Sequence, residues 1–344
     1  MAKWWRRDGT AEAADDEEAP DKPSRLGVRG WWGVVRRTVR GFMDDNLVDW
    51  AAALTYYGVL SLFPALIMAV SLVGLLGASG KRTLADNVRQ LAPGRFRDSM
   101  IGILDSLQGT APTAGVMAGV GLLLALWSAS RYVGALIRAL NAVYDMPEGR
   151  PLWKLAPLRM LLTLAMIVVL ASSALAITFT GRLAEQTGRL LGLGSAFVTA
   201  WGVLKWPVLL AIVIVAIGTL YWAGPNVRQP GRRWVTPGCV LAVLVWVAAS
   251  AGFAVYVANF GSYNRTYGAL ATAVIFLVWM WFSNVAILVG AEFDAELARG
   301  RAIGAGGDGG EPFAEPRDTS KINERDDLGE REPDARSKEP DPAK

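Results

Sequence analysis

The sequence predicts an all-α fold, a polytopic membrane helix bundle with six transmembrane helices and disordered termini. Of its 344 residues 52% are hydrophobic and only 19% are charged, which is more apolar surface than a soluble domain of that size carries. A soluble core is a poor alternative, because buried helices of globular proteins are usually shorter and show a polar face. The charges are clustered, and they leave six uncharged intervals long enough to cross a bilayer: 50–80, 106–130, 160–181, 206–227, 234–264 and 266–291.

The two ends of the chain differ in composition from its middle. They are rich in Asp, Glu, Lys, Arg, Pro and Gly, and they bury too little apolar surface to offset their chain entropy. We therefore expect a disordered N-terminal tail over 1–29 and a disordered charged C-terminal tail over 298–344. The first basic residues are followed by an acidic stretch, so no cleaved signal peptide is expected.

Residues 30–49 alternate apolar and basic positions at near-helical spacing. We expect an amphipathic helix that lies on the inner leaflet, with Arg36, Arg37 and Arg40 near anionic head groups. An ordinary surface helix is the alternative.

A six-span membrane domain is expected over 50–297. Basic residues precede the first span and lie in the connections between spans two and three and between spans four and five, which places these regions in the cytoplasm. The basic loop 81–105 falls on the outer side in this topology and argues against it. The expected spans cover about 50–77, 110–132, 158–181, 203–224, 236–260 and 267–291.

Pro64 lies near the middle of the first span. It removes a helix hydrogen bond and clashes with the carbonyl of Leu60, so the helix is expected to bend there. A freed carbonyl is costly in lipid, so the face with Tyr57 and Ser61 is expected to look into the bundle. A packing kink is the simpler interpretation, and a substrate path lined by Tyr57, Ser61 and Pro64 is the other.

Asn259, Tyr263, Asn264 and Tyr267 form the densest uncharged polar group, at a short connection between two spans. Turn formation and contact with a lipid head group are equally good explanations of this group.

Glu292, followed by Asp294 and Glu296, stands at the end of the last span. Carboxylates there can hold a cation or relay protons, but a spacing of two puts Glu292 and Asp294 on different sides of a helix. We expect Glu292 to be a helix-end carboxylate that makes hydrogen bonds at the water boundary. Arg131 and Arg138 share a helix face and could pair with Asp145 or with lipid phosphate, or simply snorkel to the boundary.

Catalytic motifs are scarce. The chain has no His and one cysteine, Cys239, so an intrachain disulfide, a Cys/His zinc site and a His-based triad are excluded. We expect no catalytic residues, no metal and no cofactor, and we expect Cys239 to be a small packing residue.

Several segments together resemble the YihY / virulence factor BrkB family of bacterial inner-membrane proteins, formerly labelled ribonuclease BN-like. The resemblance implies six spans with both termini cytoplasmic, in the bacterial inner membrane. Some members carry a ribonuclease label, and others a link to virulence or envelope lipid export. The segments are Asp49 with Ala51–Tyr57, Ser61–Pro64, Asn141–Tyr144, Tyr221–Pro225, Pro237–Gly238, Tyr256–Gly268 and Leu288–Glu292.

Three functions follow as hypotheses. The first is a transporter or handler, without its own ATPase, of an amphipathic, lipid-like envelope substrate. The second is a membrane scaffold whose tails bind partners, and the third is a membrane-embedded hydrolase or ribonuclease. Membrane lipids are the expected partners and nucleic acid is not expected, since there is no basic folded domain to hold RNA. The oligomeric state stays open.

Overall fold

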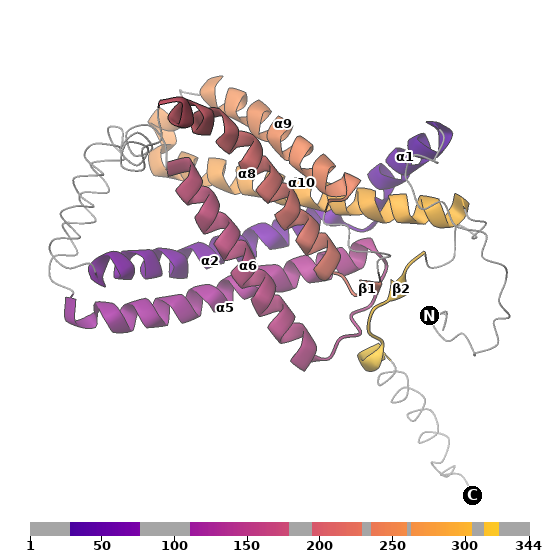
Figure 1. Ribbon diagram of the computed structural model, residues 1–344, viewed down its shortest axis with the longest axis horizontal. Helices are drawn as coiled ribbons and strands as arrows, with labels where there is room; N and C mark the ends of the chain where they lie inside the picture. Colours follow the sequence, from indigo (N-terminus) through magenta and orange to yellow (C-terminus); the bar gives the residue numbers. More distant parts are fainter. Residues whose placement is uncertain are drawn as a thin grey trace, which may run out of the picture. The chain divides into compact units, whose positions relative to one another are not determined.

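The computed structural model describes residues 28–75, 111–178, 195–228, 235–259, 263–304 and 313–322. Within these residues helices dominate, and a pair of two-residue strands is added (Figure 1). The elements are α1 (Val28–Asp44), α2 (Leu47–Leu75), α5 (Ala111–Val143), α6 (Leu152–Thr178), α8 (Ser195–Ala223), β1 (Val227–Arg228), α9 (Pro237–Asn259), α10 (Tyr263–Gly304) and β2 (Glu315–Pro316).

Five of the described helices are long and apolar enough to cross a membrane, which confirms the predicted all-α class with several apolar helices. These segments overlap the last five predicted spans. The first predicted span, 50–77, falls mostly in α2, and residues 76–77 lie outside the described residues. The total of six therefore stays a prediction. The five segments are Gly119–Val143, Leu152–Ser173, Ala200–Ala223, Pro237–Asn259 and Ala273–Ile303.

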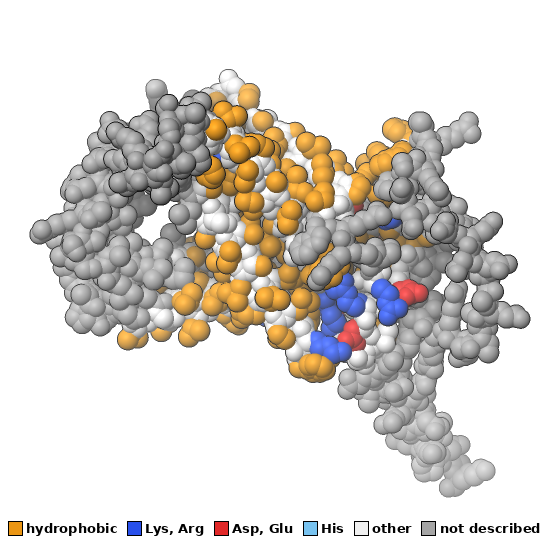
Figure 2. Space-filling model, viewed as in Figure 1, with side chains coloured by type: hydrophobic (Ala, Val, Ile, Leu, Met, Phe, Trp, Pro, Cys, Tyr) orange, Lys and Arg blue, Asp and Glu red, His pale blue; other side chains and the backbone are white. Residues whose placement is uncertain are grey.

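The chain divides into two compact units, one formed by Leu54–Gly134 and the other by the remaining residues. Large apolar side chains stay exposed on the helices; on α6, for example, Val168 is 65% and Leu170 69% exposed. Figure 2 shows hydrophobic side chains over much of the viewed face, while charged ones gather near the place where Figure 1 draws β1 and β2. Exposed apolar surface of this extent fits contact with lipid rather than water.

Two helices end at a non-glycine residue with left-handed backbone. Asn46 has φ 52° and separates α1 from α2, and its amide donates to the carbonyl of Met43 at 3.2 Å. Asp145 has φ 50° and ends α5, where the amide of Met146 donates to the carbonyl of Asn141 at 2.9 Å. Such caps satisfy the last carbonyls of a helix and let the chain turn sharply.

The amphipathic helix predicted over 30–49 is shorter than expected, because the Asn46 cap ends α1 at Asp44. One side of α1 packs on α10, where Val34 is fully buried with Phe293 and Leu297. The side not packed on α10 keeps an apolar stripe exposed at helical spacing: Trp32, Val35, Val39 and Met43. The stripe is consistent with the predicted inner-leaflet contact.

Helices α9 and α10 approach closely through two glycines. A Cβ on Gly238 would meet the carbonyl of Gly290, and a Cβ on Gly290 would meet that of Gly238. The start of α9 is capped by Thr236, whose hydroxyl accepts the amide of buried Cys239 at 3.3 Å. Small residues therefore set the spacing of this helix pair.

The C-terminal tail predicted from 298 onward is wrong for two stretches. Helix α10 continues to Gly304, and residues 313–322 fold back on the chain, where β2 pairs antiparallel with β1. Phe313 anchors this return, because its ring lies 4.4 Å from the guanidinium carbon of Arg299 and 6.1 Å from the ring of Tyr144. Composition misses such a segment, since its partners are distant in sequence. Residues 1–27, 305–312 and 323–344 lie outside the described residues.

Candidate functional site

Tyr57, Ser61 and Pro64 share one half-buried face of α2, within the Leu54–Gly134 unit. The helix is continuous through Pro64. The hydroxyl of Ser61 donates to the carbonyl of Gly58 at 2.6 Å and not to the carbonyl of Leu60 that Pro64 leaves without its amide partner. The first candidate path thus has three members on one face, and Tyr57 also contacts Arg131 of α5, 5.7 Å from the ring centroid to the guanidinium carbon.

The second candidate group is not assembled by the described residues. Asn259 is exposed, and its amide donates to the carbonyl of Val255 in its own helix at 2.8 Å. Tyr263, Asn264 and Tyr267 lie in the first turns of α10, and their side chains are outside the described residues. Asn259 therefore serves its own helix end, and contact of the other three with substrate stays a prediction.

Glu292 is not a helix-end carboxylate, because α10 continues to Gly304. Glu292 is only 2% exposed, so the surrounding protein covers it, and its expected position at the water boundary stays a prediction. Oε1 packs directly against Gly41 of α1, and Oε2 has no hydrogen-bond partner. The helix goes on past Glu292 because its next turns carry Phe293 and Leu297, which α1 covers.

The neighbouring carboxylates of α10 point to different partners. Asp294 accepts the amide of Gly238 at 2.8 Å, at the N-terminus of α9. Glu296 pairs with Arg37 of α1 at 2.6 Å and with Arg299 at 3.2 Å. Glu292 and Asp294 each have one buried oxygen without a hydrogen-bond partner, Oε2 and Oδ2. Asp294 and Glu296 therefore hold α9 and α1 on α10, whereas the buried carboxyl of Glu292 makes no such bond to the described residues of either helix.

Acidic side chains from other elements face the same end of α10. Asp145 pairs with Arg299 at 3.3 Å rather than with either arginine proposed from the sequence. Asp45 is half-buried at the α1–α2 break, and burial together with the charge of Asp145 raises its pKa to about 6. Negative charge is thus concentrated around Glu292, with Arg299 as a compensating cation.

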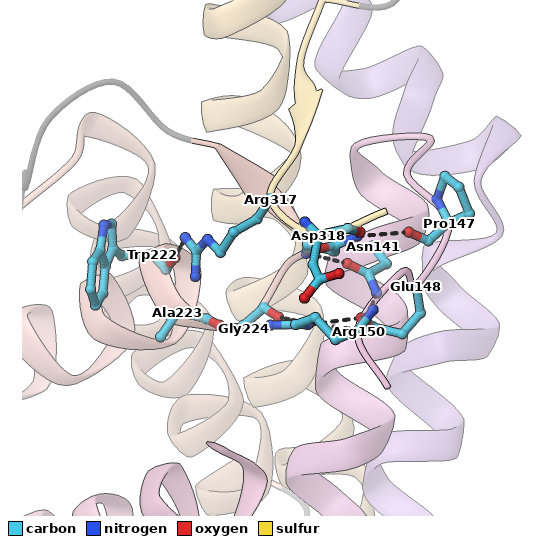
Figure 3. Close-up of polar contacts among 10 residues, drawn as sticks. Asn141, Pro147, Glu148, Arg150, Trp222, Ala223, Gly224, Arg317 and Asp318 are labelled. Atoms are coloured by element: carbon cyan, nitrogen blue, oxygen red, sulfur yellow. Dashed lines mark hydrogen bonds and ion pairs between the residues drawn. The ribbon is translucent and has the colours of Figure 1, made fainter. Parts of the chain in front are cut away.

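A polar network that the sequence did not reveal joins the α5–α6 connection to the segment after α8 (Figure 3). Arg150 is 4% exposed and donates to Glu148 at 2.7 Å and to the carbonyl of Gly224 at 2.7 Å. Burial alone would raise the pKa of Glu148, but hydrogen bonds from Arg150 and Asn141 outweigh it and hold that pKa below its ordinary value.

Asn226 is the centre of this network and is fully buried. Its amide nitrogen donates to the carbonyls of Pro147 at 3.2 Å and Asp318 at 2.8 Å, and its side-chain oxygen accepts the amide of Asp318 at 3.0 Å. Its own backbone amide donates to Asn141 at 2.7 Å. One side chain therefore ties two connections and the C-terminal segment together.

The C-terminal segment is held by ion pairs as well. Lys154 of α6 pairs with Asp318 at 2.6 Å, and this bond, with those from Ser320, lowers the pKa of Asp318 to about 2. Arg317 donates to the carbonyl of Trp222 at 2.8 Å (Figure 3). Two segments that carried the family resemblance take part in this network: Asn141 accepts the backbone amide of Asn226, and the carbonyl of Gly224 accepts a hydrogen bond from Arg150.

The chemistry available at these sites is that of charge and hydrogen bonding. Among the described residues, no group of three or more His, Cys, Asp or Glu side chains could hold a metal ion. Within the same residues, the buried Oε2 of Glu292 has no hydrogen-bond partner, and the guanidinium of Arg131 contacts two aromatic rings.

Comparisons with known proteins agree with the architecture. The sequence model of the family described as Virulence factor BrkB matches residues 38–312. The putative ribonuclease-like protein YfkH of Bacillus subtilis is 29% identical over 255 residues, which cover 74% of this chain and 90% of YfkH.

A UPF0761 membrane protein of Alkalilimnicola ehrlichii is 32% identical over 283 residues, 78% of this chain, and the chain spans 60% of that relative's length. Another, from Alteromonas mediterranea, is 25% identical over 256 residues, 74% of this chain and 84% of that protein. No solved structure matches.

Proposed function

Because this chain belongs to the Virulence factor BrkB family of membrane proteins, we propose that it moves or handles an amphipathic, lipid-like substrate of the bacterial envelope. The proposal places it in the inner membrane with both termini in the cytoplasm, as the distribution of Lys and Arg favours. The protein is proposed to act without catalysis and without a nucleotide-hydrolysing domain of its own.

One observation carries the proposal. Glu292 lies in a helix that is apolar enough to cross a membrane, yet its carboxyl is buried and its Oε2 has no partner. A buried polar atom without a hydrogen bond costs free energy, and ionisable groups within spans are typical of substrate and ion pathways. Helix packing alone does not require this cost, since Asp294 and Glu296 already hold the neighbouring helices.

The ribonuclease-like name of YfkH is not extended to this chain. The chain has no His, the commonest general acid and base. The proposed membrane function is therefore non-enzymatic and does not draw on the name of YfkH.

Reconstitution in vesicles tests the proposal. The full chain is inserted into phospholipid vesicles that contain a fluorescently labelled lipid, and transfer of the label between leaflets is followed with a membrane-impermeant quencher. We expect transfer faster than in protein-free vesicles, and slower transfer for Glu292→Gln and for Asn264→Ala.

A matched control is Ser172→Ala on α6, because this exposed hydroxyl donates only to the carbonyl of Val169 in its own helix, at 3.0 Å. Its transfer rate should equal that of the parent chain. Absence of transfer by the parent chain, or equal rates for Glu292→Gln and Ser172→Ala, would contradict the proposal.

Truncation after Ile322 separates transport from the scaffold hypothesis. Residues 313–322 pack on the membrane domain, so a scaffold that binds partners through the end of the chain would use residues 323–344. We expect the truncated chain to keep its transfer rate. Loss of transfer with an intact fold would favour the scaffold.

A further inference from the structure

Arg131 lies between two aromatic rings in the Leu54–Gly134 unit. Its guanidinium carbon is 5.0 Å from the ring centroid of Trp127, one turn earlier on α5, and 5.7 Å from that of Tyr57 on α2. Arg131 and Trp127 are exposed, and Tyr57 is half-buried. The two rings restrain the cation by cation–π contact, while its N–H edge is not consumed by these contacts.

The charge of Arg131 is not balanced within the part of the chain that the structure describes. No carboxylate there lies within ion-pair distance of it, and its contacts are the two rings. Arg37 and Arg150, in contrast, pair with Glu296 and Glu148. A guanidinium held in this way is a ready donor to an anion, and its fork matches phosphate oxygens.

The apolar segment Gly119–Val143 of α5 extends past Arg131, but the uncharged run that precedes Arg131 is long enough to fill the hydrocarbon core by itself. With residues 111–130 in the core, Arg131 lies at the level of lipid phosphates. Residues 111–130 contain no charged side chain, and twenty helical residues extend about 30 Å, the thickness of the hydrocarbon core. Arg131 is the first charge after this run, and Trp127 lies one turn inside it, where tryptophans of membrane proteins concentrate.

An exposed apolar stripe leads along α5 to Arg131. Its members are spaced at helical intervals, and Val116 and Leu123 are 72% and 69% exposed. From Val116 to Arg131 the helix rises about 22 Å, more than the roughly 15 Å of one leaflet's hydrocarbon. The stripe is Val116, Val120, Leu123 and Trp127.

We propose that Arg131, held by Trp127 and Tyr57, binds the phosphate of an anionic phospholipid whose acyl chain lies along the Val116–Trp127 stripe. This proposal adds the head group of the substrate to the proposed function. Binding of the lipid at Arg131 is independent of transport, and only the claim that the bound lipid is the transported substrate rests on the proposed function. The ligand is expected to be amphipathic because the surface combines an apolar stripe with a cation at its end, and this cation has N–H donors that the rings do not use.

Lipid binding by the purified full chain in detergent tests the site. The probe is dioleoylphosphatidylglycerol added to delipidated protein, with retained lipid counted by native mass spectrometry. Loss of a charged hydrogen bond corresponds to roughly a tenfold weaker association, and we expect this for Arg131→Gln. Arg131→Lys keeps the charge but loses the fork and the stacking, so an intermediate affinity is expected.

Arg138→Gln is the matched control, because Arg138 is exposed on the same helix, one heptad later, and no aromatic ring among the described residues holds it. We expect less than a twofold change. Equal losses in the two variants would show a general basic surface and overturn the site, as would unchanged binding by Arg131→Gln.

Two further ligands identify which part of the lipid is recognised. Dioleoylglycerol, which lacks phosphate, should bind the parent chain and Arg131→Gln equally, and millimolar inorganic phosphate should not displace the phospholipid. Displacement by inorganic phosphate would contradict a lipid site. Because binding is measured at equilibrium, Arg131-dependent binding without leaflet transfer would refute the proposed transport and leave this site standing.

Discussion

Replacing Asn226 with alanine should destabilise the membrane domain far more than the same change at an exposed amide. The substitution removes three hydrogen bonds made by the side chain, to the carbonyls of Pro147 and Asp318 and from the amide of Asp318. It leaves the backbone amide of Asn226 with its acceptor on Asn141.

The expected cost follows from the number of bonds. Each intramolecular hydrogen bond contributes about 1 kcal/mol net, so three contribute about 3 kcal/mol. Asn226 is fully buried, so the groups left behind cannot turn to water without local opening. The cost should therefore fall at or above this sum.

Unfolding in mixed micelles with increasing sodium dodecyl sulfate measures the difference, with tryptophan fluorescence as the signal. The control is Asn259→Ala, the same chemical change at an exposed amide that bonds only within its own helix. We expect a loss of about 3 kcal/mol for Asn226→Ala and about 0.5 kcal/mol or less for the control. Equal losses would refute the role assigned to the network.

Two further predictions concern α1 and its connection to α2. Gly41→Ala should cost about 1–3 kcal/mol in the same unfolding assay, because its Cβ would collide with Glu292, whereas Gly252→Ala has open space and should cost nothing. Asp45 has a folded pKa of about 6, above its ordinary 3.8, so the folded state binds the proton more tightly and loses stability as pH rises from about 4 through 6. Asp45→Asn should abolish this loss, and an unchanged pH profile would contradict the assignment.

The helices could be predicted from the sequence because uncharged intervals of span length are a property of the local chain. The ends of the helices were harder to predict from the sequence. The end of α1 depends on Asn46, which adopts left-handed backbone, and the continuation of α10 depends on Phe293 and Leu297 meeting Val34 of a helix at the other end of the chain. The residue pattern of a single segment does not predict contacts with segments that are distant in the sequence.

The polar sites likewise combine features that the local sequence predicts with features that depend on distant contacts. The sequence places Glu292 at the end of an uncharged run, which is typical of a water boundary, but its burial depends on Gly41 and on the helix beyond it. The Asn226 network was missed because Asn226 bonds to residues as far as 92 positions away along the chain, and single Asn, Arg and Asp residues in connections have no distinctive pattern. The sequence indicates Tyr57 as a candidate because it lies near Pro64. Its contact with Arg131 could not be predicted, because Arg131 lies on another helix, α5.

The most direct test of the account is the transfer of fluorescent phosphatidylglycerol across vesicles that contain the purified parent chain. Transfer well above that of protein-free vesicles, and reduced by Glu292→Gln, is the predicted result. Transfer no faster than in protein-free vesicles, with the protein folded and inserted, would contradict the claim that this membrane protein handles a lipid-like substrate.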